Sequence, residues 1–175
     1  PFLYTSNMHE KGDSGRHGGD AGMSSLADGC RLPKSDPVFA ALGDLDELSA
    51  ALGLCRAAGI ADPELRAVQE TLLGLGALVA GAARAQVVDP LPALENFAAQ
   101  LAERTGPLSG FVLPGSTPAA AAVDFARTVC RRAERSLVAV MRQEEGERLA
   151  PACRCLNRLS TVLFLLARSL DAPPV

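Results

Sequence analysis

Four arginines lie within the nine residues 127–135, and no other stretch of the chain is as well suited to bind a charged ligand. If the stretch is helical, Arg127, Arg131, Glu134 and Arg135 recur at steps of three and four and therefore share one face. A guanidinium group is planar, donates hydrogen bonds in pairs and stays charged at any working pH, which suits phosphate oxygens. The cluster predicts a site for a polyanion. The alternative is a solvated helix face with internal Glu–Arg pairs.

The segment that carries these arginines, 118–143, has no glycine and no proline after its first residue. Its apolar residues recur at three- and four-residue steps, which predicts an amphipathic helix with one buried stripe. Four more segments show helical patterns or helix-start signals, at about 37–58, 63–84, 90–104 and 149–170. The expected fold is all-α: an up-and-down bundle of five helices over residues 36–175, preceded by a separate loop region over residues 1–35.

The composition restricts the possible partners. The 175 residues suffice for one domain with a real core, and alanine and leucine, both good helix formers, supply most of the apolar 48%. A net charge of −3 gives no electrostatic reason to expect nucleic acid or an anionic membrane as a partner. Charged residues interrupt the apolar runs, so we expect no membrane span.

Five cysteines are scattered along the chain, which fits free thiols in a reducing, cytoplasmic compartment. Cys153 and Cys155 could form half of a zinc site, but no second pair or nearby histidine completes it, so we expect no protein-held metal.

Three features stand out from the helical patterns. Acidic residues interrupt the first helix at positions 44, 46 and 47, where they do not serve the helix dipole. They are either solvated or paired with an arginine from elsewhere. Asn157, within the last helix, is expected to have a specific hydrogen-bond partner. Phe111 lies in an apolar loop segment, 110–115, and has no helical stripe to join.

Three segments, taken together and in this order, resemble the ATP:cob(I)alamin adenosyltransferases of the propanediol-utilisation type. They are Arg31–Pro37 continuing into Ala41–Ser49; Phe111–Gly115 running into Ala126–Arg135; and Leu156–Ser160 with Leu163, Phe164, Ala167 and Arg168. Each piece alone is weak, whereas the combination and its separations are specific and cover nearly the whole chain.

The resemblance implies a five-helix bundle assembled as a homotrimer, with active sites between neighbouring subunits. It implies that Asp46 pairs with Arg127 across the subunit interface and that Phe111 covers the lower face of the corrin. Nucleotide binding is implied for residues of the first loop, of the arginine helix and of two further segments: Thr5, Gly12, Asp13, Lys34, Arg131, Arg132, Glu134, Arg135 and Asn157.

The activity implied is transfer of the 5′-deoxyadenosyl group of ATP to the cobalt of cob(I)alamin, which gives adenosylcobalamin and triphosphate. ATP would enter with Mg²⁺. Cob(I)alamin is itself a strong nucleophile, so the protein needs no catalytic base; it has to hold the 5′ carbon near cobalt and stabilise the departing triphosphate. A cob(II)alamin reductase and an adenosylcobalamin-dependent enzyme are the implied functional partners.

The chain departs from the family pattern mainly in the first loop. Extra residues separate Tyr4-Thr5 from Gly12-Asp13-Ser14-Gly15, and Arg16, His17 and Gly18 stand where hydroxyl residues are expected. A further insertion precedes Lys34, and Thr161-Val162 replaces an aspartate and an aromatic residue. Two alternatives therefore remain: a non-catalytic relative that carries a corrinoid or another tetrapyrrole, and a structural bundle whose arginines serve subunit contacts.

Overall fold

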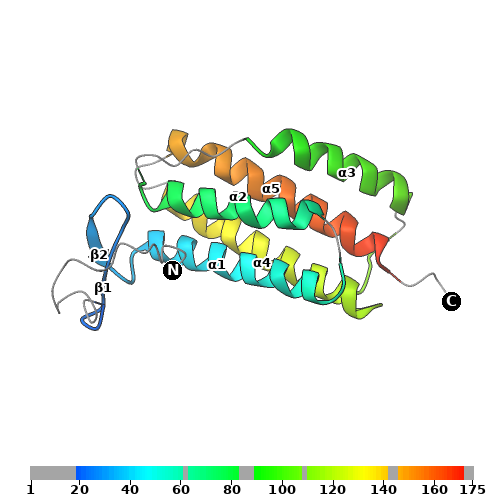
Figure 1. Cartoon of the computed structure of the whole chain (residues 1–175), viewed down its shortest axis with the longest axis horizontal. Coiled ribbons are helices and arrows are strands. Elements are labelled where there is room, and N and C mark those ends of the chain that lie inside the picture. The colour runs from blue at the N-terminus through cyan, green and yellow to red at the C-terminus, as the bar shows by residue number, and fades with distance from the viewer. Residues whose placement is uncertain (1–18, 61–62, 83–88, 108–109, 142–145, 172–175) are drawn as a thin grey trace.

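The computed structural model describes residues 19–60, 63–82, 89–107, 110–141 and 146–171. Within these ranges the chain forms five long helices and one short hairpin. The helices lie side by side along the long axis of the molecule (Figure 1). They are α1 (Pro37–Ala57), α2 (Pro63–Val79), α3 (Leu91–Thr105), α4 (Pro118–Val140) and α5 (Gly146–Ser169). The predicted all-α five-helix bundle is confirmed, whereas the homotrimer stays a prediction.

Helix α4 lies at the centre of the packing, with α1 and α5 as its main neighbours; α2 then packs on α1, and α3 on α5. Leucines close the space between these helices: Leu48 and Leu52 of α1, Leu137 of α4 and Leu156 of α5 are almost fully buried. Each buried leucine stabilises the fold by about 1.5–3 kcal/mol relative to exposure. The core therefore fixes α4, which carries the arginines, from both sides.

Side-chain caps set the starts of α1 and α4. Asp36 accepts a hydrogen bond from the backbone N–H of Val38 at 3.0 Å, and Thr117 accepts one from Ala120 at 3.0 Å. Proline follows each cap at the first helical position, where its missing N–H costs nothing. Helix ends differ more from expectation. Helix α2 stops at Val79, before the predicted end near 84, because Gly81 adopts a left-handed φ of 76°.

A β-hairpin that the sequence analysis did not predict precedes α1. Strands β1 (Met23–Ser25) and β2 (Arg31–Pro33) pair antiparallel, with Ser24 opposite Leu32. The turn is set by an Asp-Gly pair: Asp28 accepts a hydrogen bond from the N–H of Cys30 at 2.8 Å, and Gly29 has a φ of 88°. The Ala27 N–H donates to the carbonyl of Ala80 at 2.9 Å, which docks the hairpin on the end of α2. The expected loop region thus contains a β-hairpin over residues 23–33.

By length and hydropathy α5 could cross a membrane, contrary to the expectation that charges interrupt every apolar run. Its apolar residues are accounted for by the bundle, since Leu156, Leu159 and Leu163 lie in the core against the other helices. A core helix of this kind passes the same test of composition.

Candidate functional site

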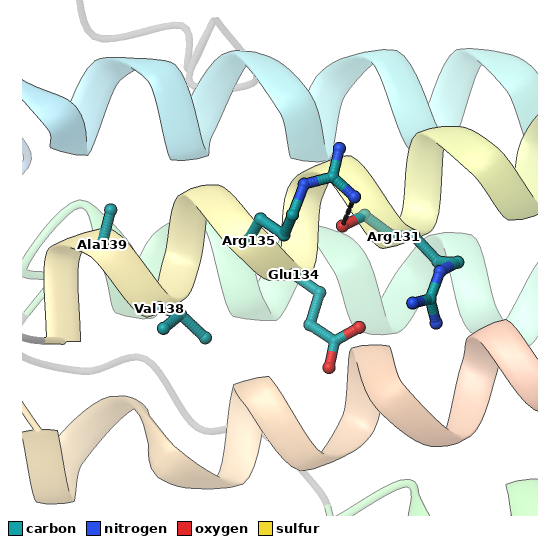
Figure 2. Close-up of a pocket in the computed structure, with 5 residues that line it drawn as sticks. All are labelled: Arg131, Glu134, Arg135, Val138 and Ala139. Carbon is teal, nitrogen blue, oxygen red and sulfur yellow. Dashed lines mark hydrogen bonds between the residues drawn. The ribbon is translucent and has the colours of Figure 1, made fainter.

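An open pocket of about 300 Å³ lies on α4 and is lined by Arg131, Glu134, Arg135, Val138 and Ala139 (Figure 2). Arg131 and Arg135 are exposed, and within the described part of the chain the Arg131 guanidinium has no hydrogen bond or ion pair. Arg135 folds back and donates to the carbonyl of Arg131 at 3.0 Å. Two guanidinium groups against one carboxylate give the pocket a positive balance, as a polyanion requires.

Glu134 is held by α5, because the side-chain amide of Asn157 donates to its carboxylate at 3.0 Å. Figure 2 shows Glu134 extending from α4 toward α5. The expectation that Asn157 has a specific partner is confirmed. The contact also brings together two residues that the family resemblance implies for ATP binding, although they lie on different helices.

Arg132, the neighbour of Arg131, has a different environment. Its Nε lies 2.8 Å from Oδ1 of Asp44, and a terminal nitrogen contacts Glu47, both on α1. Asp44 also accepts a hydrogen bond from the hydroxyl of Ser136 at 2.5 Å. Two of the mid-helix acids therefore have the arginine partner that the sequence left open. Arg132 does not line the pocket, and its role in ATP binding stays a prediction.

Arg127 lies one turn before Arg131, and its Nε is 3.5 Å from Oδ1 of Asp124 in the same helix. Asp46, its predicted partner across the subunit interface, is partly buried on α1. A contact between subunits concerns two chains, so the Asp46–Arg127 pair stays a prediction.

Lys34 and Phe111 lie at opposite ends of the bundle. The hairpin and Lys34 are at the end where α1 begins and α4 ends, whereas the loop before α4 is at the other (Figure 1). Lys34 is exposed, and its Nζ lies close to Gly19. A Cβ added at Gly19 would be 3.0 Å from this nitrogen. Phe111 is fully exposed in this single chain. Arg131 is about 20 Å along the axis from the start of α4, at about 1.5 Å per residue.

The remaining predicted nucleotide ligands, Thr5, Gly12 and Asp13, lie outside the described residues. In the ranges that the structure describes, no group of three histidine, cysteine or acidic residues could hold a metal ion.

Four of the five cysteines have thiols that burial makes poor nucleophiles. Burial raises the pKa of the Cys55 thiol from 9.0 to about 11 and that of Cys155 to about 12. Burial also raises the pKa of Cys130, and that of the half-buried Cys153, so these thiols stay protonated at neutral pH. All five cysteines are free.

The sequence model of the cobalamin adenosyltransferase family matches residues 16–170. This chain belongs to that family. It is 38% identical to the corrinoid adenosyltransferase PduO of Salmonella typhimurium over 88% of this chain and 48% of that protein. It is 37% identical to the human corrinoid adenosyltransferase MMAB over 86% of this chain and 65% of that protein. The chain thus spans about half to two thirds of the length of these curated relatives.

A solved structure extends the likeness to the fold. A variant of the PduO-type ATP:corrinoid adenosyltransferase from Lactobacillus reuteri, complexed with cobalamin and ATP, superposes with a TM-score of 0.80. The two chains are 29% identical, and the match covers 89% of this chain and 92% of that one.

The sequence analysis of this adenosyltransferase-family chain missed a second polar cluster, which lies where α4 begins and α5 ends. Arg168 lies between Asp124 and Asp171, and Asp171 accepts a hydrogen bond from Ser116. The available signals were an arginine in the apolar pattern of α5 and an aspartate in that of α4. Buried charges of this kind need partners.

Proposed function

We propose that this chain transfers the 5′-deoxyadenosyl group of ATP to the cobalt of cob(I)alamin, giving adenosylcobalamin and triphosphate. The observation that carries the proposal is the pocket on α4, where Arg131 and Arg135 face open space beside the Glu134–Asn157 pair. Family membership over residues 16–170 supports the same activity, as do relatives named corrinoid adenosyltransferases.

The reaction needs charge stabilisation rather than proton transfer. A bond forms between cobalt and C5′, the bond between C5′ and the triphosphate oxygen breaks, and the triphosphate leaves with the electron pair. Cationic donors aimed at the leaving oxygens stabilise this charge as it develops. Arg131 and Arg135 are suited to that role, and Asn157 keeps the Glu134 carboxylate turned toward α5 instead of neutralising Arg131.

Magnesium fits this site as a companion of ATP. The described residues contain no cluster able to hold a metal by themselves, so triphosphate oxygens would supply most of its ligands. Bound there, the ion would add positive charge to the triphosphate.

Phe111 is proposed to lie against the corrin. A fully exposed aromatic side chain on a loop offers a large apolar surface to a flat apolar ligand. Excluding water from one face of cobalt there would favour the reduced metal.

We further propose a cytoplasmic homotrimer in which Asp46 of one subunit meets Arg127 of the next and completes the site. Cob(I)alamin would come from a cob(II)alamin reductase, and the product would pass to an adenosylcobalamin-dependent enzyme. Sedimentation of the purified chain tests the assembly, since a monomer at all concentrations would contradict it.

The test of the activity is an anaerobic assay of the protein with cob(I)alamin, ATP and Mg²⁺, followed by the visible spectrum. We expect conversion to the cobalt–carbon bonded product only when both protein and ATP are present. Corrinoid binding without conversion would favour the carrier alternative, for which the altered first loop provides a reason. Neither binding nor conversion would leave a structural bundle.

A further inference from the structure

The loop that carries Phe111 is bounded by two glycines in left-handed conformations. Gly110 has a φ of 87° and Gly115 a φ of 106°, so the segment between them turns sharply at both ends. Phe111 and Leu113 are almost fully exposed and gain no position from core packing. The contacts that hold this segment in place must therefore lie at its ends.

Two hydroxyl groups immediately after Gly115 attach the loop to the end of α5. Thr117 donates to the carbonyl of Leu170 at 2.9 Å while it also accepts the capping bond of α4. The hydroxyl of Ser116 donates to Oδ1 of Asp171. These contacts join residues more than fifty positions apart in the sequence.

Asp171 is in turn fixed by Arg168, whose side chain is 3% exposed. The Nε of Arg168 lies 2.8 Å from Oδ2 of Asp171, and a terminal nitrogen lies 2.6 Å from Oδ2 of the buried Asp124. The guanidinium also lies over the ring of Phe164, 5.5 Å from its centroid. A planar fork held at two carboxylates and one ring has little freedom to move.

The same cluster reaches the arginine face of α4. Asp124, which is 4% exposed, accepts a hydrogen bond from Arg168 on Oδ2, and its Oδ1 lies 3.5 Å from Nε of Arg127. Two aspartates and two arginines balance, so the buried charges are compensated. Arg168 thus links the attachment of the Phe111 loop to the residue proposed to meet the next subunit.

We propose that Arg168 is a positioning residue for the corrinoid: through Asp171 and Ser116 it fixes the loop that presents Phe111. This proposal rests on the proposed function, because it specifies how the corrinoid side of that site is held. The pocket for ATP lies further along α4, and none of the residues that line it belongs to this cluster. Loss of the cluster should therefore raise the KM for cob(I)alamin more than the KM for ATP.

The experiment compares Ser116→Ala, Asp171→Asn and Arg168→Gln with a matched control, Ser169→Ala. Ser169 lies beside Arg168, but its hydroxyl donates only within α5, to the carbonyl of Leu166. For each variant the KM for cob(I)alamin, the KM for ATP and kcat are measured anaerobically. Hydrogen exchange of the backbone amides of residues 111–117 is followed in parallel on the same proteins.

We expect Ser116→Ala and Asp171→Asn to raise the KM for cob(I)alamin about fivefold, the effect of losing one hydrogen bond that orders a binding segment. The KM for ATP should change less than twofold, which is about the size of effect expected from a surface substitution away from the ATP pocket. Amide exchange in 111–117 should rise in both variants and stay unchanged in Ser169→Ala. Arg168→Gln should show the same unequal pattern with a larger effect.

Several outcomes would overturn the inference. A wild-type chain that makes no adenosylcobalamin removes the proposed function and this inference with it. An active wild type whose Ser116 and Asp171 variants shift both KM values equally, or neither, removes the inference alone and leaves the function standing. If Arg168→Gln does not fold, Ser116→Ala still decides, because its side chain is at the surface and the substitution removes only the last link.

Discussion

Arg131 and Arg132 are adjacent in sequence, yet they lie on different faces of α4 and differ in what neutralises them. Arg132 points toward α1, where Asp44 and Glu47 compensate its charge. Arg131 lines an open pocket, where among the described residues nothing pairs with its guanidinium. A helix rotates about 100° per residue, so consecutive residues face different neighbours.

This difference suggests a way to separate structural from functional arginines. A compensated arginine contributes to the fold and has few free donors for a ligand. An uncompensated arginine in a pocket contributes little to stability and keeps its paired donors for an anion from outside. The predictions below test that separation, beginning with the largest expected effect.

Arg131→Ala should lower kcat/KM for ATP by about 100-fold or more, because it removes a charged donor from the leaving triphosphate. Thermal unfolding should stay close to wild type, since no interaction within the described residues is lost. Steady-state kinetics with Arg104→Ala, an exposed arginine at the end of α3, provides the control. Unchanged ATP use in Arg131→Ala would contradict the assignment of the pocket.

Asp46→Asn should reduce activity about tenfold by removing a charge pair at the proposed subunit interface. The exchange of charges in Asp46→Arg with Arg127→Asp should restore part of that loss, although Asp124 beside Arg127 limits the recovery. Activity and sedimentation of the single and double variants are measured together. No recovery would indicate that the two residues do not meet.

Arg132→Ala should lower the free energy of unfolding by about 1–2 kcal/mol, because it leaves the mostly buried Asp44 carboxylate without its arginine. Arg66→Ala, which breaks the exposed Arg66–Glu70 pair, should cost less than about 0.5 kcal/mol. Urea unfolding measures both. If Arg132→Ala impairs ATP use as severely as Arg131→Ala, the distinction between the two faces fails.

The third face of α4 is buried and carries Cys130, whose thiol donates to the carbonyl of Leu156 at 3.3 Å. Burial raises its pKa above the ordinary 9.0, so above pH 9 the unfolded chain loses this proton first and stability falls as pH rises. Between pH 9 and 10 this loss is about 1 kcal/mol. Cys130→Ala should show a correspondingly smaller decline in urea unfolding at the two pH values; an identical decline would exclude the thiol as its cause.

Much of the bundle was predictable from local signals. Helix-start signals marked the start of α1, and the glycine-free segment from Pro118 with its apolar stripe identified α4 and its buried face. The hairpin was missed because its strands have three residues each, too few for a periodic pattern, and depend on the contact between Ala27 and Ala80. The Asp28-Gly29 turn was the one local signal for it.

The sequence by itself determined the helical class, the placement of Arg127, Arg131, Glu134 and Arg135 on one face, and the family. The first two follow from residue types and their spacing within single helices. The family follows from three segments that match its pattern. Only the tertiary structure decided which polar side chains meet: Arg132 with Asp44, Glu134 with Asn157, and Arg168 with Asp124. Most such pairs join side chains far apart in the sequence, and packing of the helices sets the register in which they meet.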